Sequence, residues 1–347
     1  MMDKLKGWAG AAALGAGLLL QAGPAAAVDQ ALIDAATKEG AVTWYSTLII
    51  DQAVRPLAAA FEEKYPGIKV SFSRATNSDT ALKIINESKA GRVQGDVFDG
   101  ALSILPLMEA GLVEPYKSEA AEAFPDELKD PDGHWTTTHR YFLTAAYNTS
   151  MVSPEEAPKT YEDLLDPKWK GNLAWTNDLT PNGPPGFIAN ILIHMGEEKG
   201  MEYLRKLAEQ QPASIPGSQR VVLDRVIGGE YPVGLMTFNH HSAISAAKGA
   251  PVDWIKMEPV VATTSSIGIV KNAPHPNAAK LFVEFVLSDE GQKVLAEALY
   301  LPARPGVAAK VPELQPDVGG FEVTSIGPAM VAENLEKWTA IYNELFR

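Results

Sequence analysis

The chain has 347 residues and a formal net charge of −13, with 43 acidic and 30 basic side chains. This acidic balance argues against a nucleic-acid partner, because binding a phosphate backbone needs a clustered basic surface. The absence of cysteine excludes disulfides, thiolate nucleophiles, iron–sulfur clusters and cysteine zinc sites.

Residues 1–27 have the pattern of a secretory signal peptide. Lys4 and Lys6 precede an uncharged stretch rich in Ala, Leu and Gly, and Ala25-Ala26-Ala27 supplies the small side chains that a signal peptidase needs. The stretch is shorter than the roughly 20 apolar residues of a membrane span. We therefore expect cleavage after about Ala27, a periplasmic location, and no membrane insertion of the mature chain.

The first part of the mature chain alternates strands and helices. A helix over 51–65 is indicated by Val54, Leu57 and Phe61, which share one face at helical spacing, and Pro66-Gly67 ends it. Strands are predicted at 41–46, 68–72 and from 96, with a further helix at 79–90. Such a run predicts a parallel sheet with helices on both faces.

A strand predicted at 139–148 leads away from these first elements, which form one lobe. A second alternating run follows it. It comprises strands at 172–176, 213–216, 232–238, 252–257 and 266–271, helices at 185–196, 200–210, 218–228 and 241–249, and a last helix at 328–345. The fold class is therefore α/β, with two Rossmann-like lobes and a cleft between them. We assign 28–138 and the return segment 261–310 to lobe 1 and 139–260 to lobe 2, and leave the lobe of 311–347 open.

Polar residues directly after the predicted strands are the candidate ligand-binding residues. In open α/β sheets, ligands sit beyond the carboxyl ends of the strands, at helix N-termini. Each Ser, Thr or Asn could instead cap a helix, and Arg140 and Arg220 could form an anion clamp or surface salt bridges. The candidates are Ser46, Thr47, Asn77, Ser78, Arg140, Tyr141, Asn177, Thr180, Ser218, Arg220, Asn239, His240 and His241.

The adjacent pair His240 and His241 is the most unusual feature among these candidates. Neighbouring residues on one element point in different directions, so joint binding of one metal is not the usual geometry. We expect no resident metal and one histidine facing the cleft. The motifs HExxH, GxSxG and GxxxxGK[ST] do not occur, so we expect neither catalysis nor a cofactor.

The order and spacing of several segments resemble the extracellular solute-binding proteins of bacterial ABC importers. The subgroup with ferric-iron and phosphonate or phosphate-ester binders is the most similar. The resemblance rests on VTWYSTL (42–48), FEEKYPGIKVSF (61–72), TYEDLLDPKWKGNLAW (160–175) and PNAAKLFVEFVLSDEGQ (276–292). It implies a type II periplasmic-binding fold with two hinge crossings, a small-molecule ligand, and a permease of the inner membrane as partner. We expect the protein to be a monomer.

One departure from this family pattern bears on the ligand. Ferric binders of the subgroup carry two adjacent tyrosines, and His240 and His241 stand in their place here. Phenolates suit Fe(III), whereas neutral imidazole suits softer divalent metals. The resemblance then implies a small organic, anionic solute, with an anion site at Asn177–Gly183 carried by Thr180 and the following amides. The alternatives are ferric or divalent metal binding through His240 and His241, a ligand-presenting sensor module, and a secreted enzyme with a histidine base.

Overall fold

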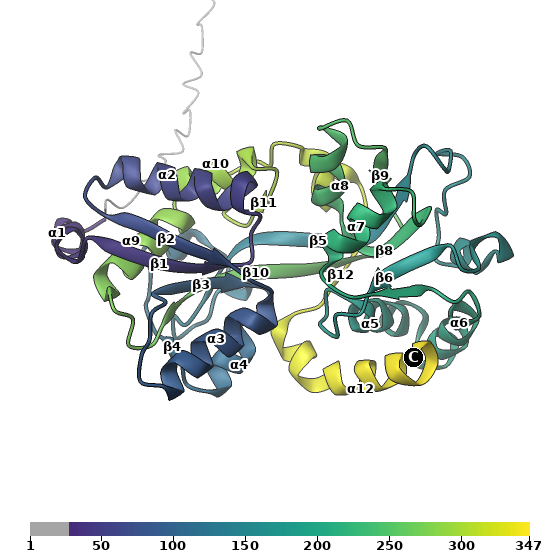
Figure 1. Cartoon of the computed structure of the whole chain (residues 1–347), viewed down its shortest axis with the longest axis horizontal. Helices are drawn as coiled ribbons and strands as arrows, with labels where there is room; N and C mark the ends of the chain where they lie inside the picture. Colours follow the sequence, from purple (N-terminus) through teal and green to yellow (C-terminus); the bar gives the residue numbers. More distant parts are fainter. Residues whose placement is uncertain (1–27) are drawn as a thin grey trace, which may run out of the picture.

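A computed structural model describes residues 28–347, so the predicted signal peptide lies outside the described residues. One continuous sheet runs through both halves of the molecule in the order β2-β1-β3-β10-β5-β8-β6-β7 (Figure 1). The short strands β4 and β12 pair with β10, and β9 and β11 pair with β5. Within the described range, no helix is both long and apolar enough to cross a bilayer.

The first half contains the N-terminal elements together with a later helical segment. Its early elements are α1 (Gln30–Glu39), β1 (Ala41–Ser46), the π-helix η1 (Ile50–Val54), α2 (Arg55–Lys64), β2 (Lys69–Arg74), α3 (Asn77–Lys89), β3 (Val97–Gly100), α4 (Ile104–Glu109), β4 (Val113–Glu114) and the 3₁₀ helices η2 (Ala120–Ala123) and η3 (Asp126–Leu128). The later segment, α9 (Pro276–Leu287) and α10 (Asp289–Glu297), returns to pack on α1, α2 and β1.

The second half contains the middle of the chain and its C-terminal helix. Its elements are η4 (Glu162–Leu165), η5 (Pro167–Trp169), β6 (Leu173–Thr176), α5 (Pro184–Met195), α6 (Glu197–Glu209), β7 (Ala213–Ile215), α7 (Gln219–Ile227), β8 (Val233–Phe238), α8 (Asn239–Ala246), β9 (Val252–Trp254) and α12 (Pro328–Phe346). Helix α12 packs on α5 and α6 (Figure 1). This contact places the C-terminal helix, whose lobe the sequence left open, in the second half.

Two long antiparallel strands join the halves. They are β5 (Thr136–Asn148) and β10 (Val260–Val270), paired from Val261 opposite Leu143 to Ile267 opposite Thr136, with an irregularity at Ser265/Ser266. Strand β10 also pairs with β3, and β5 also pairs with β8. The short elements β11 (Leu301–Pro302), η6 (Pro312–Leu314), α11 (Pro316–Gly319) and β12 (Val323–Ser325) complete the chain.

The two joining strands correct the expected sheet in two respects. The prediction of parallel strands is right for β1, β2 and β3 and for β6, β7 and β8. In contrast, β5 runs antiparallel to β8 and β10, and β10 runs antiparallel to β3, β4 and β5 and parallel to the short strand β12. Both also begin earlier than predicted, β5 at Thr136 and β10 at Val260. The first three residues of β5 are threonines, which are buried in the sheet but do not show the apolar pattern by which strands are recognised.

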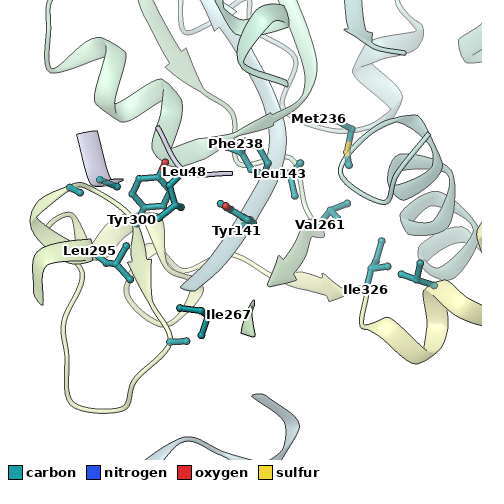
Figure 2. Packing of buried hydrophobic residues seen from close by; sticks show 14 of the residues in the cluster. Leu48, Tyr141, Leu143, Met236, Phe238, Val261, Ile267, Leu295, Tyr300 and Ile326 are labelled. Atoms are coloured by element: carbon teal, nitrogen blue, oxygen red, sulfur yellow. The ribbon is translucent and has the colours of Figure 1, made fainter. Parts of the chain in front are cut away.

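The hydrophobic core is continuous across the joining strands. In the first half, Trp44 packs against Phe282 with ring centroids 5.1 Å apart, and in the second half Trp175 packs against Tyr342 at 5.8 Å. One cluster of buried residues contains all four. Figure 2 shows its central part along β5, where the rings of Tyr141, Phe238 and Tyr300 gather.

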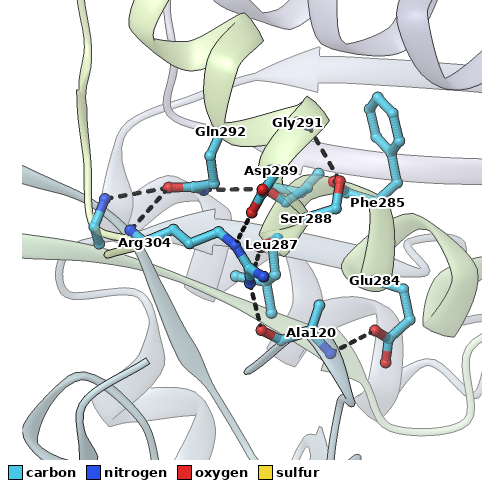
Figure 3. A network of polar contacts seen from close by, with 11 residues as sticks. Ala120, Glu284, Phe285, Leu287, Ser288, Asp289, Gly291, Gln292 and Arg304 are labelled. Carbon is cyan, nitrogen blue, oxygen red and sulfur yellow. Dashed lines mark hydrogen bonds and ion pairs between the residues drawn. The ribbon is translucent and has the colours of Figure 1, made fainter. Parts of the chain in front are cut away.

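A buried carboxylate fixes the loop after β4 onto α9. Glu284 is 3% exposed and accepts hydrogen bonds from the Tyr116 hydroxyl at 2.8 Å and from the backbone amides of Glu119 and Ala120 at 3.0 and 2.9 Å. Arg304 donates to the Ala120 carbonyl at 2.8 Å and is paired with Asp289 (Figure 3). The segment after β11 is thereby tied to the same loop.

We predict that Glu284→Ala destabilises the protein by about 2–4 kcal/mol, because three donors would lose their acceptor in a buried place. Urea unfolding measures this change. The matched control is Glu290→Ala on the neighbouring helix, where the half-exposed pair with Lys64 contributes less than about 1 kcal/mol. Equal effects of the two substitutions would contradict the structural role given to Glu284.

Candidate functional site

A cleft of about 450 Å³ lies where the two halves face each other. Its walls come from the carboxyl ends of β1, β2, β6 and β8 and from the first residues of α3 and α7. The predicted residues that line it are Thr47, Asn77, Ser78, Tyr141, Asn177, Thr180, Ser218, Arg220 and His241. The rule that ligands bind beyond the carboxyl ends of strands therefore selects residues that the tertiary structure brings together.

Other predicted site residues do not line the cleft. Ser46 and Asn239 are fully buried, and their side chains bond the backbone: Ser46 accepts from the Leu48 amide, and Asn239 donates to the Leu314 carbonyl. His240 is fully buried behind Tyr141.

Arg140 is also outside the cleft lining, for a reason of strand geometry. It precedes Tyr141 on β5, and successive strand side chains point to opposite faces. Since Tyr141 faces the cleft, Arg140 faces away. Arg140 and Arg220 therefore do not form an anion clamp in this structure.

The first wall is held in place by a buried aspartate. Asp99, on β3, accepts hydrogen bonds from the Thr47 amide at 2.8 Å and the Thr47 hydroxyl at 2.7 Å. Burial raises the pKa of Asp99. A glycine is required beside this pair, because a Cβ on Gly100 would lie 2.3 Å from Oδ1 of Asn77. The loop after β1 is thus packed tightly against the start of α3.

Arg74 is a cleft residue that the sequence analysis missed. It is the last residue of β2, two positions beyond the end predicted for this strand, and the candidates after the strand began only at Asn77. Its guanidinium lines the cleft, and its Nε donates to the Thr47 carbonyl at 3.3 Å. The signal that could have identified it is a charged side chain between the predicted strand and the following helix.

Arg220 approaches from the second half, on the first turn of α7. Its guanidinium donates to the Ser245 hydroxyl at 3.0 Å and pairs with Asp224 at 2.7 Å. Its side chain is 30% exposed, which leaves part of it accessible from the cleft. Ser218 precedes this helix but makes no capping hydrogen bond through its side chain, so its hydroxyl is available to a ligand.

The loop Asn177–Gly183 follows β6 and is tightly closed on itself. The Thr180 hydroxyl donates to Asp178 Oδ2 at 3.0 Å and accepts from the Asn182 amide at 3.4 Å. The Gly183 amide donates to the Thr180 carbonyl at 2.9 Å. Thr180 is therefore engaged within the loop, and Asp178, which the sequence analysis did not select, lines the cleft beside it.

The floor of the cleft is aromatic. Phe238 packs on Tyr141 with centroids 4.6 Å apart and on His241 at 5.0 Å, and Tyr300 also lines the cleft. The Ile49 amide donates to the Tyr300 oxygen at 3.1 Å, which leaves the phenolic proton free to donate. Burial is the main cause that raises the pKa of both Tyr141 and Tyr300, so both are neutral phenols.

Three imidazoles lie in and behind this floor, and all are neutral. Burial lowers the pKa of His240 to about 3. Burial also holds the pKa of His139 well below its usual range, and His240 adds to this effect. The pKa of His241 is also held well below its usual range. Burial is the largest cause, followed by His240 and by the positive charges of Arg220 and Arg74.

The cleft does not present a set of metal ligands. Over residues 28–347, the three His, Asp or Glu ligand atoms that could share one ion belong to Asp130, Asp132 and His134, which do not line the cleft. Asp130 already accepts bonds from both Asp132 and His134, so this group is a closed turn. His241 lines the cleft, but its unpartnered Nδ1 is buried, and His240 lies behind it.

Known proteins similar to this chain are solute binders. A family model described as "Bacterial extracellular solute-binding protein" matches residues 96–318. Iron uptake protein A1 of Synechocystis sp. is 28% identical over 240 residues, or 64% of this chain and 66% of that relative. The major ferric iron-binding protein of Neisseria gonorrhoeae is 24% identical over 81% of this chain and 86% of its own length.

A solved structure is similar over nearly the whole described chain. The periplasmic binding protein AfuA from Actinobacillus pleuropneumoniae, with fructose-6-phosphate bound, has a TM-score of 0.72 and 25% identity, and the match covers 88% of this chain and 98% of that one. The chain spans slightly less than two thirds of the length of the Synechocystis relative. These matches confirm the expected α/β binding-protein fold and the expectation that the chain is not an enzyme.

The buried imidazoles predict that the protein loses stability as the pH falls. A histidine whose folded-state pKa is depressed resists protonation, whereas the unfolded chain takes up the proton near pH 6.5. With the pKa of His240 at about 3, this residue alone lowers the free energy of unfolding by about 2 kcal/mol between pH 7.5 and pH 5.

Urea unfolding at pH 7.5, 6 and 5 tests this expectation. His240→Gln should show a smaller loss between the extremes than the unmodified protein, by that same amount. His194→Gln, at an exposed position on α5, should leave the pH dependence unchanged. An identical pH profile for all three proteins would show that His240 is not held neutral.

Proposed function

The chain belongs to the family of bacterial extracellular solute-binding proteins, and we propose that it captures a small organic anion between its two halves. In this proposal, the protein then delivers the anion to the permease of an ABC importer in the inner membrane. Export through the signal peptide at 1–27, with cleavage after about Ala27, and a monomeric state are parts of the same proposal.

The observation that carries the proposal is a pair of arginines on opposite walls of one cleft. Arg74 ends β2 in the first half, and Arg220 begins α7 in the second. Guanidinium groups bind carboxylates and phosphates through paired N–H donors. A ligand anion between them would be bound by both halves at once, which would stabilise a closed form over an open one.

The backbone near the arginines also favours an anion. The first residues of α3 and α7 line the cleft, and helix N-termini present free amides and a partial positive charge. The hydroxyls of Ser78 and Ser218 line the same region. The similar AfuA structure holds a sugar phosphate, which is an anion of this class.

The neutral aromatic floor argues for an organic ligand over a bare inorganic ion. Tyr141, Phe238, His241 and Tyr300 present ring surfaces that can pack against a carbon skeleton. A cleft of about 450 Å³ is also within the size range of small-molecule sites. The ligand would thus place its charge near the arginines and its carbon atoms on the floor.

Iron is the second candidate, because the relatives include an iron uptake protein and a ferric iron-binding protein. His241 favours it, since this residue lines the cleft and its buried Nδ1 has no hydrogen-bond partner. Against it, Fe(III) prefers anionic oxygen ligands, whereas burial raises the pKa of the nearby Tyr141 and Tyr300 phenols. Two arginines beside the same space would repel a cation.

We predict that phosphate esters, phosphonates or carboxylates raise the unfolding temperature of the mature protein, and that Arg74→Ala and Arg220→Ala each weaken binding about 10–100-fold, the usual loss for a charged hydrogen bond. Calorimetric titration measures the change. The matched control is Arg225→Ala on the same helix, whose arginine forms a surface pair with Glu230 and does not line the cleft.

The same thermal-unfolding measurements should include Fe(III), with and without citrate, and Zn(II). A thermal shift with metal alone, abolished in His241→Ala and retained in Arg220→Ala, would replace the organic-anion proposal with metal uptake. Anion binding that both arginine variants retain would also reject it, because no other cationic side chain lines the cleft within residues 28–347.

A further inference from the structure

The cleft contains a carboxylate that no cation of the protein neutralises. Asp178 lines the cleft with Arg74 and Arg220. Across residues 28–347, no ion pair joins Asp178 to a lysine or arginine, and Arg220 pairs with Asp224 instead. An acidic side chain at an anion-binding site is unfavourable unless the ligand donates a hydrogen bond to it or neutralises its charge.

Side chains of the protein donate hydrogen bonds to one carboxylate oxygen of Asp178 and none to the other. Its Oδ2 accepts from the Thr180 hydroxyl at 3.0 Å and from Gln219 Nε2 at 3.4 Å. Gln219 is itself fixed, because its Nε2 also donates to the Asn182 carbonyl at 3.0 Å. Among the described residues, the side-chain donors bond Oδ2 and none bonds Oδ1, whereas a carboxylate accepts at both oxygens.

The backbone prevents Asp178 from moving away. Its amide donates to the Thr176 hydroxyl at 3.0 Å. Its carbonyl oxygen lies where a Cβ on Gly183 would be only 2.0 Å away, so that position has to be glycine for the loop to close. The backbone of Asp178 is therefore fixed at the cleft wall, and the bonds from Thr180 and Gln219 orient its side chain there.

A carboxylate fixed in this way imposes a requirement on the ligand. Closing the cleft removes water from the free oxygen, and that oxygen then needs a donor. An anion with no donor would bring negative charge near Asp178 and leave the oxygen unpaired. An anion that also carries an O–H or N–H group would satisfy it.

We infer that Asp178 determines specificity by accepting a hydrogen bond from a hydroxyl or ammonium group of the captured organic anion. This inference rests on the proposed function and deepens it, because it assigns the ligand two ends. The anionic end is bound by Arg74 and Arg220, and the donor end is bound by Asp178. Inorganic phosphate and unsubstituted anions are then poor ligands.

Three phosphonates that differ in one group test this inference: ethylphosphonate, 2-hydroxyethylphosphonate and 2-aminoethylphosphonate, with inorganic phosphate as a fourth probe. In the mature protein we expect the hydroxyl or amino compound to bind at least about 10-fold more tightly than ethylphosphonate. In Asp178→Asn this preference should fall to less than about threefold, while ethylphosphonate binds as well as before or better, because a repelling charge is gone.

The control is Asp317→Asn, at an exposed position on α11, which should keep the full preference. If all three phosphonates bind the mature protein equally, or if Asp178→Asn keeps the preference, the inference is wrong and the organic-anion proposal stands. If none of the four anions binds, and phosphate esters and carboxylates do not bind either, the proposed function fails and the inference fails with it. The comparison within the unmodified protein decides the matter even if Asp178→Asn does not fold.

Discussion

The antiparallel pairing of β5 with β10 is the constraint on which the other features depend. These two strands run through both halves, and each pairs outward with a strand of one half, β10 with β3 and β5 with β8. The halves therefore share one sheet and one core, and the strand ends of both halves open on the same space. A bend or twist of this pair would move the two walls of the cleft relative to each other, as hinge motions do.

The chemistry of the cleft follows from what this shared sheet buries. Burial keeps the imidazoles and phenols of the floor neutral, so the fixed charges at the cleft are those of the arginines and aspartates on its walls. Under the proposed function, the neutral rings of the floor would pack against the ligand without adding charge, while the walls would determine which charged groups it carries.

Several cleft-lining residues could be predicted because their positions depend on local sequence. Thr47, Asn77, Ser218 and Arg220 follow strands and open helices, and both boundaries can be recognised from a few neighbouring residues. Tyr300 is different. It meets the Ile49 amide across 251 positions of the chain, and no local pattern indicates that contact. His240 and His241 are adjacent in sequence, yet only the orientation of α8 determines that His241 lines the cleft while His240 is buried behind it.

The amino-acid sequence by itself determined the α/β class, the order of most strands and helices, and the family pattern, because helical spacing, strand alternation and turn residues are properties of short segments. Only the tertiary structure decided that β5 and β10 run antiparallel between the halves. It also decided that Arg74 replaces Arg140 as the partner of Arg220 at the cleft, and that Asp178 lies there without a cation. These outcomes depend on packing between residues far apart in the chain, where the energy of a contact is set by burial and by partners that the local sequence does not contain.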